Sequence, residues 1–109
     1  MASEKRKTQR LRLSIEAVCK AGDKFFKADI TDISPGGVKL ETPRELNTGE
    51  KIVFTMEWKG PLKLKGTVRW FRREGLHYVY GIQFDGLSPE QEARVREIIQ
   101  DIFWKNYGG

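Results

Sequence analysis

The sequence is short of the residues that most often build catalytic and metal centres. Its 109 residues include one histidine, His77, and one cysteine, Cys19. One cysteine excludes an internal disulfide and a cysteine-based zinc cage. One histidine leaves no Ser/His/Asp or Cys/His set for nucleophilic or acid–base catalysis. Gly36-Gly37 is too short for a phosphate-binding loop. We therefore expect no enzymatic activity, no bound metal and no cofactor.

Long hydrophobic runs are also missing. The longest unbroken apolar runs have three residues, as in Tyr78-Val79-Tyr80, which excludes a membrane-spanning helix and a signal-peptide core. With 39% hydrophobic residues and a mean hydropathy of -0.56, the composition is typical of one soluble folded domain. We expect a cytoplasmic protein that does not insert into membranes.

Positive charge is scarce outside the first twelve residues. Residues 1–12 hold five Lys and Arg against one Glu, a net charge of +4, and the remainder holds 15 basic and 14 acidic residues, a net charge of +1. The broadly basic surface of a polynucleotide-binding protein is therefore not expected. Residues 1–10 are expected to form a flexible basic arm, because charged chain ends are usually disordered.

Alternation of apolar and polar residues predicts short strands in most of the chain. The first alternating run starts at Leu11 and continues to Cys19, which we interpret as a small core residue. Five further runs follow, beginning near Phe26, Val38, Ile52, Leu62 and Tyr78. Phe54, Trp58 and Trp70 share strand faces with aliphatic residues, which predicts that they are core. Six short strands at this spacing favour an antiparallel barrel, which removes exposed edges.

The last segment changes to a helical period. Ser88 is a suitable N-cap, Pro89 suits the first helical position, and Gln91 can complete a capping box. An apolar stripe at three- and four-residue spacing follows, formed by Val95, Ile98, Ile99, Ile102 and Phe103. The stripe predicts a helix over about 89–106 that docks on the barrel. Residues 11–109 are thus expected to be one mainly β domain, a six-stranded antiparallel β-barrel with a C-terminal α-helix.

Two short motifs carry ligand-binding chemistry. Arg6 and Arg10 lie four residues apart in the basic arm, and guanidinium groups match phosphate oxygens and stack on purines. Asp32 and Ser34 lie two residues apart before Gly36-Gly37, so in a strand both side chains point the same way and the glycines expose the backbone. Each motif alone also fits a simpler interpretation, a solvated tail or an ordinary turn.

Together these residues resemble the PilZ domain family, bacterial receptors for the second messenger cyclic di-GMP. Arg6 and Arg10 match an RxxxR motif, and a [D/N]xSxxG motif is matched by Asp32, Ser34 and Gly37. Two late-strand signatures of the family also have counterparts, in Val68-Arg69-Trp70 and Gly81-Ile82-Gln83-Phe84. The fold of the family, a six-stranded antiparallel barrel with a C-terminal helix, agrees with the predicted elements.

The resemblance implies a single-domain receptor that works as an adaptor. Arg6 and Arg10 would bind phosphates and guanine faces of cyclic di-GMP, while Asp32 and Ser34 would hydrogen-bond a guanine. The ligand would clamp the arm onto the barrel and create a surface for a protein effector, which the sequence does not identify. No polynucleotide partner is expected.

Three further positions belong to the predicted site. Gly36 and Gly37 would leave the backbone open to the ligand. Lys5 stands where many family members have another arginine, and a lysine pairs with phosphate but does not stack on guanine. Whether the chain binds one ligand or an intercalated pair therefore stays open.

Two alternatives also stay open. A degenerate PilZ-like domain would bind only a protein, without nucleotide. A small barrel that binds single-stranded nucleic acid would need exposed aromatic residues interleaved with basic ones. Trp70 and the pair Arg72-Arg73 would supply these, but the strand pattern favours a core tryptophan and a solvated hairpin.

Overall fold

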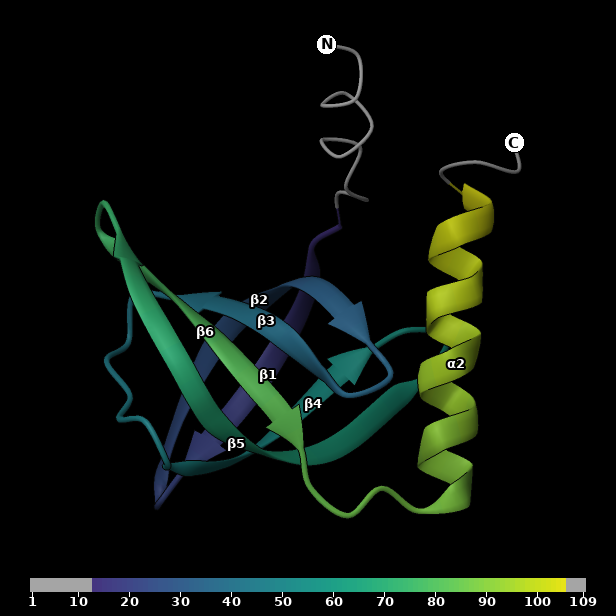
Figure 1. The fold of residues 1–109 in the computed structure, drawn as a ribbon, viewed down its shortest axis with the longest axis horizontal. Helices are drawn as coiled ribbons and strands as arrows, with labels where there is room; N and C mark the ends of the chain where they lie inside the picture. Colours follow the sequence, from purple (N-terminus) through teal and green to yellow (C-terminus); the bar gives the residue numbers. More distant parts are fainter. Residues whose placement is uncertain (1–12, 106–109) are drawn as a thin grey trace, which may run out of the picture.

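The computed structural model describes residues 13–105, which form a closed barrel and one helix (Figure 1). Its elements are β1 (Ile15–Ala21), β2 (Lys24–Ser34), β3 (Gly37–Thr42), β4 (Lys51–Glu57), β5 (Pro61–Glu74), β6 (His77–Phe84) and α2 (Pro89–Phe103). Neighbouring strands are antiparallel in the order β1-β2-β3-β6-β5-β4, and β1 pairs with β4 to close the barrel. The predicted fold is confirmed, although the first strand begins at Ile15 and the helix ends at Phe103.

The core lies inside the barrel and follows the predicted alternation. In β1 every second side chain is buried, from Ile15 to Ala21. Cys19 is fully buried, and burial raises the pKa of its thiol to about 12. The thiol is therefore protonated at neutral pH and serves as a small apolar side chain, as predicted.

Helix α2 begins where the sequence predicts, at a capping box. The Ser88 hydroxyl accepts a hydrogen bond from the backbone N–H of Gln91 at 3.1 Å, and the Gln91 side-chain oxygen accepts one from the N–H of Ser88 at 2.8 Å. Three residues of the apolar stripe join the barrel core, Val95, Ile98 and Ile102. The capping box satisfies two N–H groups that the first turn would otherwise leave unpaired, and the stripe holds the helix against the barrel.

Trp58 joins the barrel to the helix. It is half-buried, and its indole N–H donates a hydrogen bond to Asp101 on α2 at 3.0 Å. Lys59 also contacts this carboxylate, at 3.1 Å. The hydrogen bonds from Trp58 and then Lys59 lower the pKa of Asp101. In the other direction, Arg94 of α2 donates to the carbonyl of Trp58 at 2.9 Å. Trp58 therefore lies at the junction of barrel and helix rather than deep in the core.

A bulge in β5 makes the prediction for Trp70 wrong. Val68 pairs with Ile82 of β6, and Trp70 pairs with the next residue, Gly81, so that Arg69 is an extra residue in β5. An extra residue shifts the alternation by one and turns the following side chains to the opposite face. Trp70 is consequently 40% exposed on the outside of the barrel instead of buried beside Val68.

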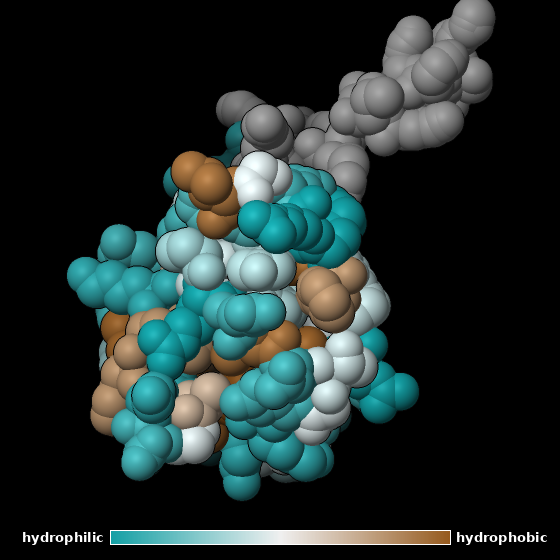
Figure 2. Space-filling model, turned by 90° about the vertical axis from the view of Figure 1, so that its left-hand side faces the viewer, coloured by the Kyte–Doolittle hydropathy of each residue, from teal (hydrophilic) through white to brown (hydrophobic). Residues whose placement is uncertain are grey.

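The face of the molecule away from α2 is mostly polar. Seen from the side away from α2, hydrophilic side chains cover most of it and apolar atoms appear in separate patches between them (Figure 2). Across residues 13–105, no helix is long and apolar enough to span a membrane.

Tyr80 anchors the loop between β3 and β4. Its ring is fully buried in the core. Its hydroxyl accepts a hydrogen bond from the N–H of Leu46 at 2.7 Å and donates one to the carbonyl of Arg44 at 2.8 Å. One phenol thus satisfies two backbone groups of a segment that has no strand partner.

We expect Tyr80→Phe to lower the free energy of unfolding by about 1–3 kcal/mol, because a buried N–H and a carbonyl lose their partner. Urea unfolding followed by circular dichroism measures this. Tyr78→Phe is the matched control, since the Tyr78 hydroxyl makes no hydrogen bond within the described residues. Equal losses in the two variants would show that the hydrogen bonds of Tyr80 do not stabilise the loop.

Candidate ligand-binding site

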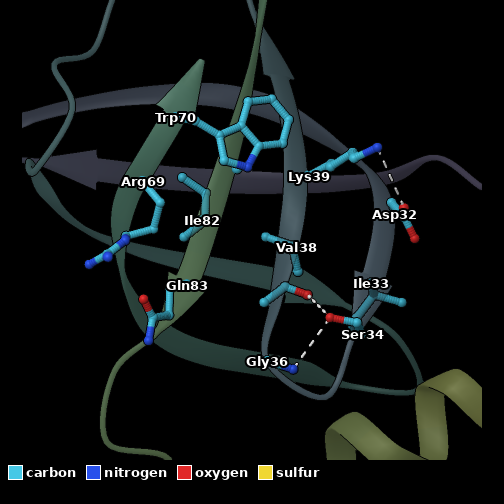
Figure 3. A pocket seen from close by; sticks show the side chains of 12 residues that line it. Asp32, Ile33, Ser34, Gly36, Val38, Lys39, Arg69, Trp70, Ile82 and Gln83 are labelled. Atoms are coloured by element: carbon cyan, nitrogen blue, oxygen red, sulfur yellow. Dashed lines mark hydrogen bonds and ion pairs between the residues drawn. The ribbon is translucent and has the colours of Figure 1, made fainter. Parts of the chain in front are cut away.

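A cavity of about 300 Å³ opens on the barrel wall where β2, β3, β5 and β6 lie side by side (Figure 3). Its polar and aromatic lining comes from Asp32 and Ser34 of β2, Lys39 of β3, Arg69 and Trp70 of β5, and Gln83 of β6. Two cationic groups and one carboxylate therefore share this cavity with an exposed indole. Such a lining suits a ligand that carries negative charge, hydrogen-bond donors and flat rings.

The carboxylate of Asp32 reaches this cavity because of a second bulge. Ile30 pairs with Leu40 of β3 and Asp32 pairs with Lys39, so Thr31 is the extra residue in β2. Without it, Asp32 would continue the inward series of Ile30; with it, the Asp32 side chain is 47% exposed. The Lys39 ammonium lies 3.9 Å from the Asp32 carboxylate, a loose ion pair across the two strands.

Ser34 lies beside Asp32 and organises the turn after β2. Its hydroxyl accepts a hydrogen bond from the N–H of Gly36 and donates one to the carbonyl of Gly37, both at 3.3 Å (Figure 3). These bonds are long, and the hydroxyl is exposed. A ligand can therefore share the Ser34 hydroxyl without uncovering a buried polar group.

Gly36 and Gly37 differ in the space that surrounds them. A side chain on Gly37 would overlap the backbone carbonyl of Ile82, because β3 and β6 approach closely there. A side chain on Gly36 would meet nothing within 4 Å. Gly37 is thus required by the packing of two strands, whereas Gly36 leaves open space at the rim of the cavity.

Trp70 is held against the barrel by a third glycine. A side chain on Gly81 would overlap the indole of Trp70, so the ring rests directly on the β6 backbone. The guanidinium of Arg72 lies 5.7 Å from the centre of the same ring. Strand alternation missed Trp70 as a site residue. The available signal was Gly81 inside a predicted strand, because a glycine there leaves room for a large side chain on the neighbouring strand.

Three predicted site residues, Lys5, Arg6 and Arg10, fall in residues 1–12 and lie outside the described residues. The structure therefore places the [D/N]xSxxG motif in a cavity, whereas the RxxxR motif lies outside the described residues. In the described range 13–105, no group of three or more His, Cys, Asp or Glu could hold a metal ion.

The family model of the PilZ domain matches residues 4–101. The chain belongs to the PilZ domain family. The match extends over the arm motif, the cavity and most of α2. No curated protein matches the chain.

Solved structures show the same fold in other proteins, among them a structure described as a PilZ domain. MrkH from K. pneumonia in its apo state has a TM-score of 0.73 and 19% identity, over 90% of this chain and 52% of MrkH. YcgR from Escherichia coli in complex with c-di-GMP has a TM-score of 0.73 and 17% identity, over 90% of this chain and 47% of YcgR. The PilZ domain of CeSA from a cellulose-synthesizing bacterium has a TM-score of 0.60 and 17% identity, over 88% of this chain and 96% of that domain. The chain thus spans about half the length of MrkH and YcgR.

We expect Gly37→Ala to lower the free energy of unfolding by about 2–4 kcal/mol, because the new methyl group meets backbone that cannot move without breaking the β3–β6 pairing. Gly36→Ala is the control and should change it by less than about 0.5 kcal/mol, since its methyl group meets open space. Chemical denaturation of both variants measures the difference. A Gly37→Ala protein as stable as the wild type would mean that the strands have room to separate.

Proposed function

We propose that this chain is a receptor for cyclic di-GMP and that the ligand binds over the cavity between β2, β3, β5 and β6. One observation carries the proposal: Asp32, Ser34 and the exposed indole of Trp70 line one cavity together with Lys39 and Arg69. Cyclic di-GMP presents two phosphates and two guanines, so its charge and its rings match this lining. The YcgR structure, with the same fold, is a complex with c-di-GMP.

Each lining residue has a role that its chemistry suits. The Asp32 carboxylate would accept hydrogen bonds from the N1–H and N2 amino group of one guanine, and Ser34 would bond the same base. Trp70 would offer an exposed ring for stacking. Lys39 and Arg69 would face the phosphates, because both are cations at the cavity wall. Lys39 would then leave its loose contact with Asp32, which costs little at a half-exposed site.

The basic arm would supply the remaining contacts. Residues 1–10 would close over the ligand, with Arg6 and Arg10 on its phosphates and guanine faces, while 11–109 stays a single folded barrel. The ordering of the arm costs conformational entropy, so it needs several charge-assisted hydrogen bonds at once. A closed arm would present a new surface to a protein effector, which makes the chain an adaptor. Lys5, in place of a third arginine, would decide whether one ligand or an intercalated pair is held.

A second candidate function, binding of single-stranded nucleic acid, is supported by one observation. Trp70 is 40% and Phe71 is 51% exposed, and the basic residues Arg72 and Arg73 follow them directly. Such platforms stack bases without sequence preference. The ring of Phe71, however, contacts Tyr78 and Tyr80, with centroids 6.3 and 6.2 Å apart. Phe71 is thus already packed against two tyrosine rings, which favours the small ligand over a series of stacked bases.

Calorimetric titration with cyclic di-GMP tests the proposal. We expect Asp32→Ala and Arg10→Ala each to weaken binding by about 10-fold or more, because each removes charge-assisted hydrogen bonds. Asp29→Ala is the matched control, an exposed carboxylate of the same strand outside the cavity, and should keep the wild-type affinity. The number of ligands bound per chain answers the question that Lys5 raises.

Three outcomes would contradict the proposal. They are no heat of binding with the wild type, an Asp32→Ala protein that binds as tightly as the wild type, and tighter binding of an oligothymidine than of cyclic di-GMP. The third outcome would favour the nucleic-acid function.

A further inference from the structure

The wall of the barrel formed by β1, β4 and the adjoining halves of β2 and β5 carries a concentration of lysines. We call this wall the lysine face. Five exposed lysines project from its outer side: Lys20, Lys27, Lys51, Lys63 and Lys65. The net charge of +1 beyond the first twelve residues gives no hint of such a face, because four strands from different parts of the sequence bring the lysines together.

The strand register sets apolar side chains between these lysines. In one row across the sheet, Lys20 pairs with Phe25 on one side and with Val53 on the other, and Val53 pairs in turn with Lys65. In the next row, Val18 pairs with Lys27 of β2. Phe25 is 67% and Val18 is 51% exposed, so the face offers apolar side chains flanked by ammonium groups.

The charges on this wall are separated along the strands. Glu16 of β1 pairs with Asp29 of β2 at one end, whereas the lysines occupy the rows toward the turn between β1 and β2. Of the described residues, Asp85 alone forms an ion pair with any of these five lysines, with Lys51 at 3.6 Å. Most of the positive charge of the face is therefore available to a partner.

A shallow cavity of about 220 Å³ lies in this face. Its charged lining residues are Lys20, Lys51, Lys65 and Asp85, and Asp85 is the ion-pair partner of Lys51. The ammonium groups of Lys20 and Lys65, which form no ion pair within the described residues, can receive an anionic head group here, such as a phosphodiester.

We propose that the lysine face docks the protein on a membrane surface that contains anionic lipids. Clusters of four to eight basic residues attract such surfaces, and each residue near the membrane raises the affinity by about fivefold. Exposed apolar side chains among them add binding by entering the head-group region. Val18 and Phe25 have this position, and the lysines can direct their ammonium groups to lipid phosphates while their stems lie along the apolar strip.

The composition of the face favours a lipid surface over a polynucleotide. Single-stranded nucleic acids need several aromatic rings as stacking platforms. In the described part of the face Phe25 is the one exposed aromatic residue, and the ammonium of Lys20 already lies 5.4 Å from the centre of its ring. Val18 and Val53 offer no stacking surface to bases.

The position of the face leaves the candidate ligand site free. In the barrel order β1-β2-β3-β6-β5-β4, the strands β3 and β6 lie opposite β1 and β4 (Figure 1). A membrane bound at β1 and β4 would thus leave the cavity at β3 and β6 facing away from the lipid. Docking is independent of the proposed ligand and does not rest on it.

Co-sedimentation of the full chain with vesicles tests this docking. We expect binding to phosphatidylcholine vesicles in which about a third of the lipid is phosphatidylglycerol, and none to pure phosphatidylcholine. Lys20→Glu combined with Lys65→Glu should weaken binding by about 30-fold or more, because two attractions become repulsions. Phe25→Ser should weaken it by a few fold, and most visibly at high salt, where charge attraction is screened.

The matched control combines Arg96→Glu with Lys105→Glu, two exposed cations on and just after α2. It changes the net charge by the same amount and leaves the lysine face and the basic arm intact, so binding should fall by less than about threefold. Thermal unfolding checks that both double variants are folded. Three outcomes would overturn the proposal. The first is an equal loss of vesicle binding in the two double variants, and the second is no vesicle binding by the wild type. The third is a Lys20→Glu, Lys65→Glu protein that loses binding to an oligothymidine but binds vesicles as the wild type does.

Discussion

Two single-residue bulges, at Thr31 in β2 and Arg69 in β5, decide what the outer wall of the barrel carries. Each adds one residue to a strand without adding one to its partner, so every later side chain changes face. Asp32 and Trp70 therefore leave the series of inward residues and meet on the outside, in one cavity. An unbulged barrel with this sequence would place a carboxylate and an indole N–H in its core, where neither is easily satisfied.

The bulges work together with glycines on the neighbouring strands. Gly37 allows β3 and β6 to approach, and Gly81 receives the Trp70 ring. The carboxylate of Asp32 and the indole of Trp70 are in this way mounted on hydrogen-bonded strands rather than on loops. Rigid mounting favours binding, because little freedom of these groups is lost when a ligand arrives. The conformational entropy that is lost on binding would then come mainly from the basic arm, which is proposed to close over the ligand.

The barrel also separates two kinds of surface. The wall at β3 and β6 carries the cavity with its aromatic and hydrogen-bonding groups, and the wall at β1 and β4 carries lysines with exposed apolar side chains. A receptor that docks on a membrane surface by one wall and binds a small ligand at the other wall can hold the membrane and the ligand at once. Closure of the sheet makes this possible, since it gives the domain two outer walls around one core.

Much of this protein follows from the sequence by itself. Strict alternation in β1, the capping box at Ser88 and the apolar stripe of α2 determined the barrel and its helix, because burial of one face dictates such periods. Local spacing also singled out Asp32 and Ser34. The side of the barrel on which Trp70 lies depended on a bulge, which leaves no mark in the alternation that precedes it. The packing reason for Gly37 and the gathering of five lysines on one wall depended on partners far away in the chain. Only the tertiary structure decides these features, because strand register, and not sequence distance, sets which residues become neighbours.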